Sequence, residues 1–188
     1  MTQTADLFTG ARRVFWGYFF LLLDFNLNLG SAVTIPLLAN CVGWIFLWRG
    51  VDALAPVRPS LDLLKPFCTA LGVCALTQFV PALDSLLPGW LSLFISMLTL
   101  YTHFQLLTDL ASLAEEVLGD GEVAGRLRLL RTILVVSQTV LYCSDLLNLF
   151  IASPGLVLLL ALANFCVYVV LLIQLWTLSR ELESPQSP

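Results

Sequence analysis

Charge is scarce in this 188-residue sequence. Only 12% of the residues are Asp, Glu, Lys or Arg, about half the share of an ordinary soluble domain. The nine basic residues form no run that could follow a phosphate backbone, which argues against nucleic-acid binding. Hydrophobic residues make up 59% of the chain and the mean hydropathy is +0.90. These values predict a protein whose solvent is largely lipid.

Motifs of catalysis and metal binding are also missing. The sequence has no HExxH, no GxSxG and no phosphate-binding P-loop, so it gives no grounds for an enzyme. It lacks the Asp-rich loop of calcium sites as well. The five cysteines include no C-x-x-C pair, and their odd number favours buried thiols over a disulfide framework. We therefore expect no cofactor and no metal.

Long apolar stretches are what the sequence does contain. A helix needs about 20 apolar residues to cross a hydrocarbon core, and six stretches have about this length. Pro, Gly and charged residues separate them. The stretches are 12–29, 34–54, 63–83, 89–112, 127–148 and 155–178. The expected fold class is all-α: one polytopic membrane domain in which six transmembrane helices form a bundle. Pro36 is expected in the first turn of the second helix, where its missing N–H costs nothing.

The basic residues predict how these helices are threaded. With six alternating spans, every Lys and Arg falls on one side, together with both termini. The residues are Arg12, Arg13, Arg49, Arg58, Lys65, Arg126, Arg128, Arg131 and Arg180. Because Lys and Arg are enriched in cytoplasmic loops, we expect both termini in the cytoplasm.

Three aspartates recur at similar intervals on the opposite side. Asp24, Asp84 and Asp145 are 60 and 61 residues apart, and each comes near the end of an odd-numbered span. Three repeated helical hairpins would give this pattern. Any six-span chain with short loops also repeats near this length, so repetition stays one of two interpretations.

Carboxylates and amides gather at the expected outer ends of the spans. The candidate ligand-binding residues are Asp24, Asn26, Asn28, Asp84, Gln138, Tyr142, Asp145 and Asn148. Gln138, Tyr142 and Asp145 follow a 4-3 spacing and so share one face of the fifth helix. An acidic rim without basic neighbours could attract a cation or an amine-bearing solute. The alternative is that these side chains only cap helix ends in water.

Polar side chains also occur inside the apolar stretches, where each is costly. Asn40, Gln78, His103 and Asn164 could form an intramembrane polar network. The single histidine, His103, could serve a proton relay. Hydrogen-bonded packing between helices is the interpretation we favour, with Gln78, Gln138 and Asn164 as partners.

The turn before the fifth span joins an acidic segment to a basic one. Glu115, Glu116, Asp120 and Glu122 precede Arg126, Arg128 and Arg131. These charges could pair across a helical hairpin or dock a cytoplasmic partner, although solvated charge is the simpler interpretation.

The beginning of the chain resembles a group of small uncharacterised multipass proteins of bacterial genomes. The likeness rests on residues 15–28, which read FWGYFFLLLDFNLN, and on Pro36 and Gly43-Trp44-Ile45. It implies a location in the plasma membrane of a bacterial cell, but no activity. In size, number of spans and cytoplasmic termini, the chain is also similar to the substrate-binding S-components of energy-coupling-factor vitamin transporters, a similarity of architecture alone.

Two functions from different classes fit these features. The first is binding or transport of a small, unidentified solute from the outer side, through a pocket among the first, third and fifth helices. The second is a non-enzymatic accessory or assembly protein that packs against other membrane proteins and has no substrate. The lipid bilayer is a partner in both.

Overall fold

A computed structural model of the protein describes residues 2–23, 26–28, 34–36, 39–77, 89–119, 121–146 and 154–183. Within these ranges the fold is all-α, as the apolar stretches predict. Its six α-helices are α1 (Thr2–Leu22), α2 (Ala39–Leu54), α3 (Lys65–Thr77), α5 (Gly89–Leu118), α6 (Gly121–Leu146) and α8 (Pro154–Glu183). A 3₁₀ helix, η1 (Pro59–Leu64), leads into α3. Two three-residue strands, β1 (Asn26–Asn28) and β2 (Thr34–Pro36), pair between α1 and α2.

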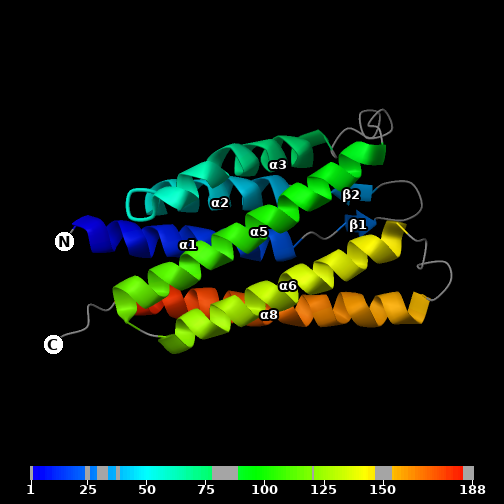
Figure 1. The fold of residues 1–188 in the computed structure, drawn as a ribbon. Helices are drawn as coiled ribbons and strands as arrows, with labels where there is room; N and C mark the ends of the chain where they lie inside the picture. Colours follow the sequence, from blue (N-terminus) through cyan, green and yellow to red (C-terminus); the bar gives the residue numbers. More distant parts are fainter. Residues whose placement is uncertain are drawn as a thin grey trace.

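Consecutive helices run in opposite directions and close into a ring (Figure 1). The order around the ring is α1, α2, α3, α5, α6 and α8, with α8 packed on α1. The contact between α1 and α2 is the most extensive, and the seam between α3 and α5 is the thinnest. Because six is an even number, α1 begins and α8 ends at the same end of the ring. All nine Lys and Arg residues lie towards this end, which we call the charged end.

The connection between α1 and α2 differs from the prediction. The first helix ends at Leu22 instead of continuing to 29, because residues 26–28 pair with residues 34–36 as antiparallel strands. Asn disfavours a helix interior, since its side chain competes for backbone hydrogen bonds. Pro36 was expected in the first turn of the second helix and instead ends β2. A strand at the edge of a sheet tolerates Pro, which has no N–H to donate.

Four helices continue at the charged end beyond the apolar stretches. α5 reaches Leu118, α8 reaches Glu183 and α6 begins at Gly121, each five or six residues further than expected. α1 begins at Thr2, ten residues before the predicted start. Charged side chains are well solvated in water, so a helix can continue past a bilayer surface without penalty. Gly125 lies inside α6. The turn itself uses Gly119, whose φ of 65° suits glycine at the end of a helix.

Glycines bring the backbones of α1 and α2 close together. They are Gly10 and Gly17 on α1 and Gly43 and Gly50 on α2. Each pair is spaced by seven residues, about two helical turns, so both glycines of a pair face the neighbouring helix. A Cβ at Gly17 would lie 2.7 Å from the Leu47 Cγ, and one at Gly43 would lie 3.0 Å from the Gly17 carbonyl oxygen. Each glycine is thus a notch that a large side chain of the opposite helix fills.

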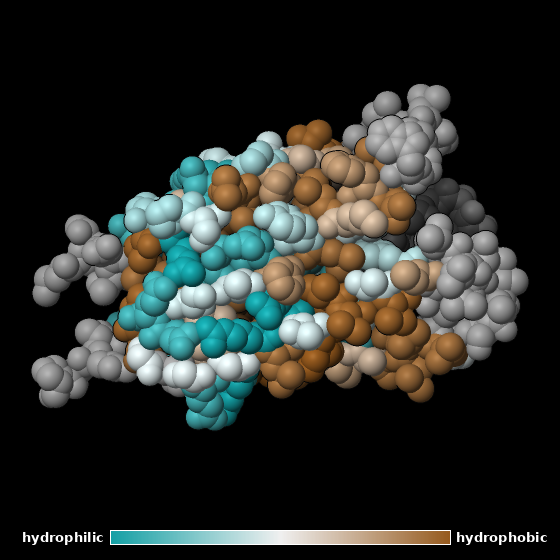
Figure 2. All heavy atoms as spheres, viewed as in Figure 1, coloured by the Kyte–Doolittle hydropathy of each residue, from teal (hydrophilic) through white to brown (hydrophobic). Residues whose placement is uncertain are grey.

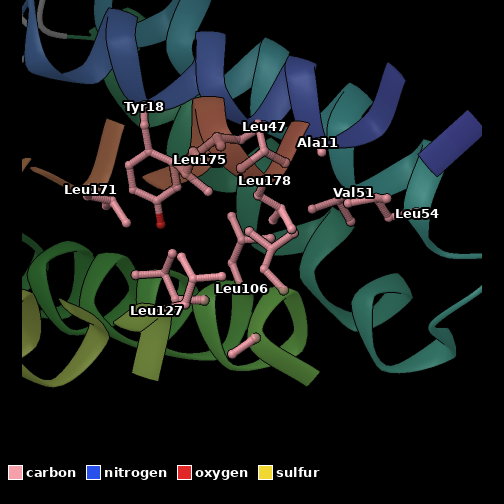
Figure 3. Close-up of a cluster of buried hydrophobic side chains, with 14 of the residues drawn as sticks. Ala11, Tyr18, Leu47, Val51, Leu54, Leu106, Leu127, Leu171, Leu175 and Leu178 are labelled. Atoms are coloured by element: carbon pink, nitrogen blue, oxygen red, sulfur yellow. The ribbon is translucent and has the colours of Figure 1, made fainter. Parts of the chain in front are cut away.

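Aliphatic side chains from all parts of the ring fill its centre (Figure 3). Leu47 of α2, Leu106 of α5 and Leu171 of α8 are each fully buried. Tyr18 of α1 is the largest fully buried side chain among them. The tight fit of this core matters in lipid, where helices associate through packing and not through the hydrophobic effect.

Large apolar side chains also cover the outside. Among those on α5 and α8 that are exposed are Phe94, Met97, Leu158, Leu159 and Leu162. Figure 2 shows hydrophobic residues dominating the end of the ring away from the charged end. Within the described residues, three segments are long and apolar enough to cross a membrane: Pro59–Leu76, Leu91–Leu118 and Leu158–Glu183. These segments indicate that the protein associates with a membrane.

Hydroxyl groups on the helices bond to their own backbone. Eight Ser or Thr residues donate to the carbonyl oxygen four residues earlier, at 2.7–3.0 Å: Thr69, Ser96, Thr99, Thr102, Thr108, Thr132, Thr139 and Thr177. In lipid a hydroxyl has no water to bond. This arrangement lets Ser and Thr face hydrocarbon with their donors satisfied.

Candidate functional site

A chain of aromatic and polar side chains crosses the middle of the ring. Tyr18 of α1 and His103 of α5, 0% and 1% exposed, meet with 3.0 Å between the Tyr18 hydroxyl and the His103 Nδ1. The indole of Trp44 on α2 lies 5.8 Å from the imidazole, measured between ring centroids. Three helices therefore hold the single histidine in place.

The chain continues towards α6. The rings of Tyr18 and Tyr168 on α8 lie 6.4 Å apart, and Gln138 of α6 donates through Nε2 to the Tyr168 hydroxyl at 2.5 Å. The carboxamide oxygen of Gln138 has no hydrogen-bond partner among the residues that the structure describes, although the side chain is only 7% exposed. A buried acceptor without a donor costs about 1–3 kcal/mol. This oxygen is therefore a place where a donor from a ligand would be favoured.

The chemistry available to the chain is hydrogen bonding in an apolar surrounding. A neutral imidazole carries its proton on either nitrogen, so the bond between Tyr18 and His103 can run in either direction. Hydrogen bonds count for more in such a low-dielectric interior than in water. The chain is suited to orienting a polar ligand or passing a proton.

Gln138 and Tyr142 are the members of the predicted outer rim whose side chains the structure describes. They lie one turn apart on α6, Gln138 buried and Tyr142 half-buried. Three others belong to described backbone, but their side chains are not described: Asn26, Asn28 and Asp145. Three lie outside the described residues: Asp24, Asp84 and Asn148. The acidic rim as a whole stays a prediction.

The structure gives hydrogen-bond partners for two members of the predicted intramembrane network. Among the residues that the structure describes, His103 bonds to Tyr18 and not to Gln138 or Asn164. Asn164 of α8 instead accepts a hydrogen bond of 2.8 Å from the hydroxyl of Ser137 on α6. Asn40 is half-buried near the start of α2, and Gln78 lies outside the described residues. His103 and Asn164 therefore each join two helices.

Sequence reasoning missed Trp44, Tyr18 and Tyr168 because aromatic residues are common throughout apolar helices. The available signal for Tyr18 is its spacing. It completes a 4-3-4 series of buried positions on α1: Leu7, Ala11, Val14 and Tyr18. Such a series predicts that the tyrosine faces the core, where its hydroxyl needs a partner.

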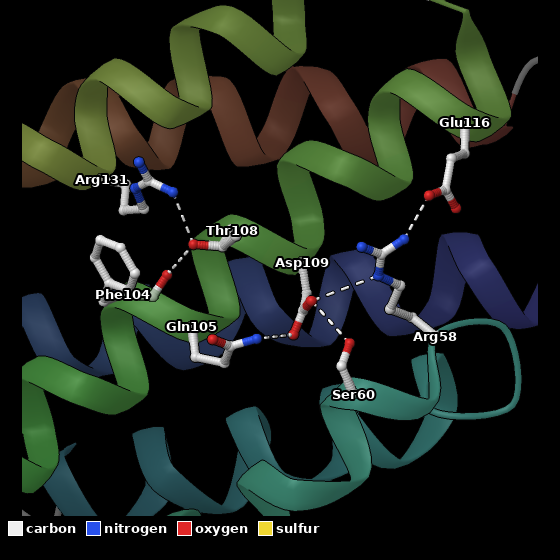
Figure 4. A network of polar contacts seen from close by, with 8 residues as sticks. All are labelled: Arg58, Ser60, Phe104, Gln105, Thr108, Asp109, Glu116 and Arg131. Atoms are coloured by element: carbon white, nitrogen blue, oxygen red, sulfur yellow. Dashed lines mark hydrogen bonds and ion pairs between the residues drawn. The ribbon is translucent and has the colours of Figure 1, made fainter.

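A second polar cluster lies at the charged end around Asp109 of α5, which is 2% exposed (Figure 4). Its Oδ1 accepts hydrogen bonds from the Ser60 hydroxyl at 2.8 Å and from the Arg58 Nε at 3.5 Å. Its Oδ2 accepts one from the Gln105 amide at 3.0 Å. A buried carboxylate requires such donors. The cluster fastens η1 and the residue before it to α5, across the thinnest seam of the ring.

Two arginines extend this cluster. Arg58 also donates to Glu116 at 2.5 Å, a hydrogen bond that raises the pKa of its guanidinium. Arg131 of α6 donates to the Thr108 hydroxyl at 2.9 Å and lies over the Phe104 ring at 4.4 Å (Figure 4). An arginine stacked on an aromatic face gains a cation–π attraction. The charged end is thus held by specific contacts on α5.

The acidic and basic segments on either side of Gly119 are partly paired. Arg128 of α6 contacts Glu115 of α5, a pair that crosses the hairpin, and Arg126 contacts Glu122 within α6. Some of these charges are therefore paired, and the interpretation that all of them are simply solvated is only partly correct. All four side chains are exposed, so each pair contributes only about 0–1 kcal/mol.

Within the described residues, no three His, Cys, Asp or Glu side chains are grouped in a way that could hold a metal ion. The chain matches no family model, no curated protein and no solved structure. The resemblances drawn from the sequence stay predictions, and function has to be argued from the geometry.

Proposed function

We propose that this protein crosses a bacterial plasma membrane six times, with both termini in the cytoplasm, and binds or transports a small amine-bearing solute from the outer side. The threading is supported by the ring of six alternating helices and by the nine basic residues at one end. Placing the charged end in the cytoplasm leaves the ends of α1, α3 and α6 that carry the predicted rim on the outer side.

The unpartnered oxygen of Gln138 is the observation that supports solute binding. Gln138 lies eight residues before the end of α6 at Leu146, which is about 12 Å along the helix. Tyr142 stands one turn further out and Asp145 close to the end. An ammonium group attracted by the aspartates could donate an N–H to the Gln138 oxygen and so satisfy it. The hydrogen bond from Gln138 to Tyr168 fixes the amide in position.

Thermal unfolding of the detergent-purified protein tests the proposal. We expect primary amines to raise the apparent Tm, because a ligand that binds the native state stabilises it. At a hundred times the dissociation constant the gain is about 2.7 kcal/mol, or about 5–10 °C. Tetramethylammonium has the charge but no N–H, and we expect a clearly smaller shift with it.

Gln138→Leu should abolish the shift caused by amines. Thr139→Val is the matched control, since Thr139 is exposed on the same helix and bonds only to its own backbone. The control should keep the shift. Equal shifts in the Gln138→Leu variant and the unchanged protein, or no shift with any amine, would rule out the binding site.

Labelling in intact cells tests the threading separately. In a variant with its native cysteines replaced, a cysteine at position 126 should react with a membrane-impermeant maleimide only after the cells are opened. The same cysteine labelled from outside would reverse the proposed orientation. Position 126 is exposed and belongs to the charged end, so a lack of reaction after lysis would point to misfolding instead.

A second function is supported by a different observation. Partners within the protein satisfy polar side chains of the ring: the buried His103 bonds to Tyr18, and the half-buried Ser137 bonds to the half-buried Asn164. This dry pairing favours an accessory protein that packs against other membrane proteins. Retention of a defined partner after purification, together with no thermal shift across cations, amines and vitamins, would favour this function over solute binding.

A further inference from the structure

An apolar groove of about 360 Å³ runs along the outer surface of the ring between α2 and α3. Its walls include Cys41, Trp44 and Trp48 of α2 and Cys68, Gly72 and Leu76 of α3. Its volume falls within the range of about 300–1,000 Å³ found for ligand pockets. The absence of a side chain at Gly72 deepens it, since a Cβ there would approach the Trp44 Cβ to 3.4 Å. Trp48 and Leu76 are exposed, so the groove opens outwards.

A polar recess continues the groove towards the charged end. Asp52 follows Trp48 by one helical turn on α2, and Lys65 precedes Thr69 of the groove by one turn on α3. The lining of the recess includes these two residues and Asp62 of η1, together with Ala55, Pro56 and Pro59. The Lys65 ammonium lies 2.6 Å from the Asp52 carboxylate and 2.7 Å from the Asp62 carboxylate. Groove and recess therefore form one amphipathic slot along the same two helix faces.

The length of the slot matches one leaflet of a bilayer. From Lys65 to Leu76, α3 rises by eleven residues, or about 16 Å. The hydrocarbon core of a bilayer is about 30 Å thick, so one leaflet is about 15 Å deep. With the polar recess at the head-group level, the apolar groove ends near the midplane. An acyl chain has the required length and chemistry.

The charges of the recess select the head group. Two carboxylates and one ammonium complement a head group that carries one phosphate and one amine. The phosphate would approach Lys65, and the amine would approach Asp52 and Asp62, which are 52% and 64% exposed. An anionic head group without an amine would be repelled by two carboxylates and attracted by only one ammonium group, so it should bind less well.

We propose that the slot between α2 and α3 binds a phospholipid of the inner leaflet with a zwitterionic, amine-bearing head group, of the phosphatidylethanolamine type. The proposal requires α2 and α3 to lie in a bilayer with the charged end at its inner surface. It does not require the solute site at Gln138, which lies on another helix.

Native mass spectrometry of the full chain in mild detergent measures the binding directly. The probes are phosphatidylethanolamine and phosphatidylglycerol with identical acyl chains, each added at the same concentration. We expect more bound phosphatidylethanolamine, by up to about fivefold, which is the most that one surface ion pair can supply. The variant carrying Asp52→Asn and Asp62→Asn leaves Lys65 alone, and should reverse the preference towards phosphatidylglycerol. Both aspartates are exposed, so the fold should be unaffected.

Filling the groove tests the acyl-chain part of the slot. Gly72→Leu should remove most of the bound lipid, whereas Gly125→Leu should not. Gly125 is a matched control, because it lies on an exposed face of α6 with no atom near enough for a Cβ to contact.

Three results would overturn the proposal. They are equal binding of the two lipids, unchanged lipid binding by the Gly72→Leu variant, and a dimer that the same substitution dissociates. The dimer would assign the groove to a second copy of the chain.

Discussion

Gly17→Leu should lower the apparent Tm of the detergent-purified protein by about 6–12 °C, the largest effect expected for a single substitution in the ring. A Cβ at Gly17 would already lie 2.7 Å from the branched Cγ of Leu47 and 3.0 Å from the Leu47 backbone nitrogen. Neither atom is the free end of a side chain, so α1 and α2 would have to separate. Overpacking of this kind costs about 3 kcal/mol, which corresponds to the stated shift for a chain of this size.

The Gly17 variant needs a control for the change of residue type itself. Gly125→Leu places the same side chain in the exposed interior of α6. A helix favours Leu over Gly by roughly 0.5–1 kcal/mol, so the Tm of this control should be unchanged or slightly higher. If both variants lost the same stability, close packing between α1 and α2 would not be what holds the hairpin together.

Arg58→Met should be nearly as damaging, because it leaves the buried carboxylate of Asp109 without its cationic partner. Breaking one side of a fully buried ion pair costs about 3–5 kcal/mol. We expect a loss no greater than the lower end of this range, because the Arg58 side chain is 28% exposed and because Ser60 and Gln105 continue to donate to Asp109. The apparent Tm should fall by about 6–12 °C. Thermal unfolding monitored by circular dichroism is the measurement.

A double-mutant cycle isolates the interaction. In the background of Asp109→Asn there is no buried charge to leave unpaired, and Arg58→Met should then cost about 1 kcal/mol or less. Arg128→Met, which removes an exposed pair with Glu115, should also cost less than about 1 kcal/mol. A loss for Arg58→Met that is the same in both backgrounds would mean that the arginine acts through another contact, such as Glu116.

The positions of the helices could be predicted from sequence, because a run of apolar side chains is a strong local signal. Their ends were harder to predict. The apolar stretch that begins at Gly89 was expected to end at position 112, yet α5 continues through Glu115 and Glu116 to Leu118. These charges bond to neighbouring side chains, and hydropathy contains no information about such pairing. The strands that replace the end of the first predicted helix depend on pairing between residues 26–28 and 34–36, which is likewise absent from a one-dimensional profile.

The candidate site was also predicted only in part, because sequence shows which residues are unusual in an apolar helix but not which residues contact one another. Gln138 was found because an amide in an apolar helix is conspicuous. Tyr18 and Tyr168 were not, because an aromatic residue there is ordinary. The partnership of Arg58 with Asp109 joins residues 51 positions apart. Only the three-dimensional structure brings them together.

The interlocking of α1 and α2 has a consequence for how the protein is made. A leucine seated in a glycine notch has to be lifted out before either helix can slide along the other. The correct alignment of this hairpin is therefore decided locally, by contacts between positions 10 and 54. The helices that follow in the sequence pack against this preformed hairpin: α3 packs against α2, and α8 packs against α1. Assembly can proceed in the order of synthesis, with the C-terminal helix completing the ring.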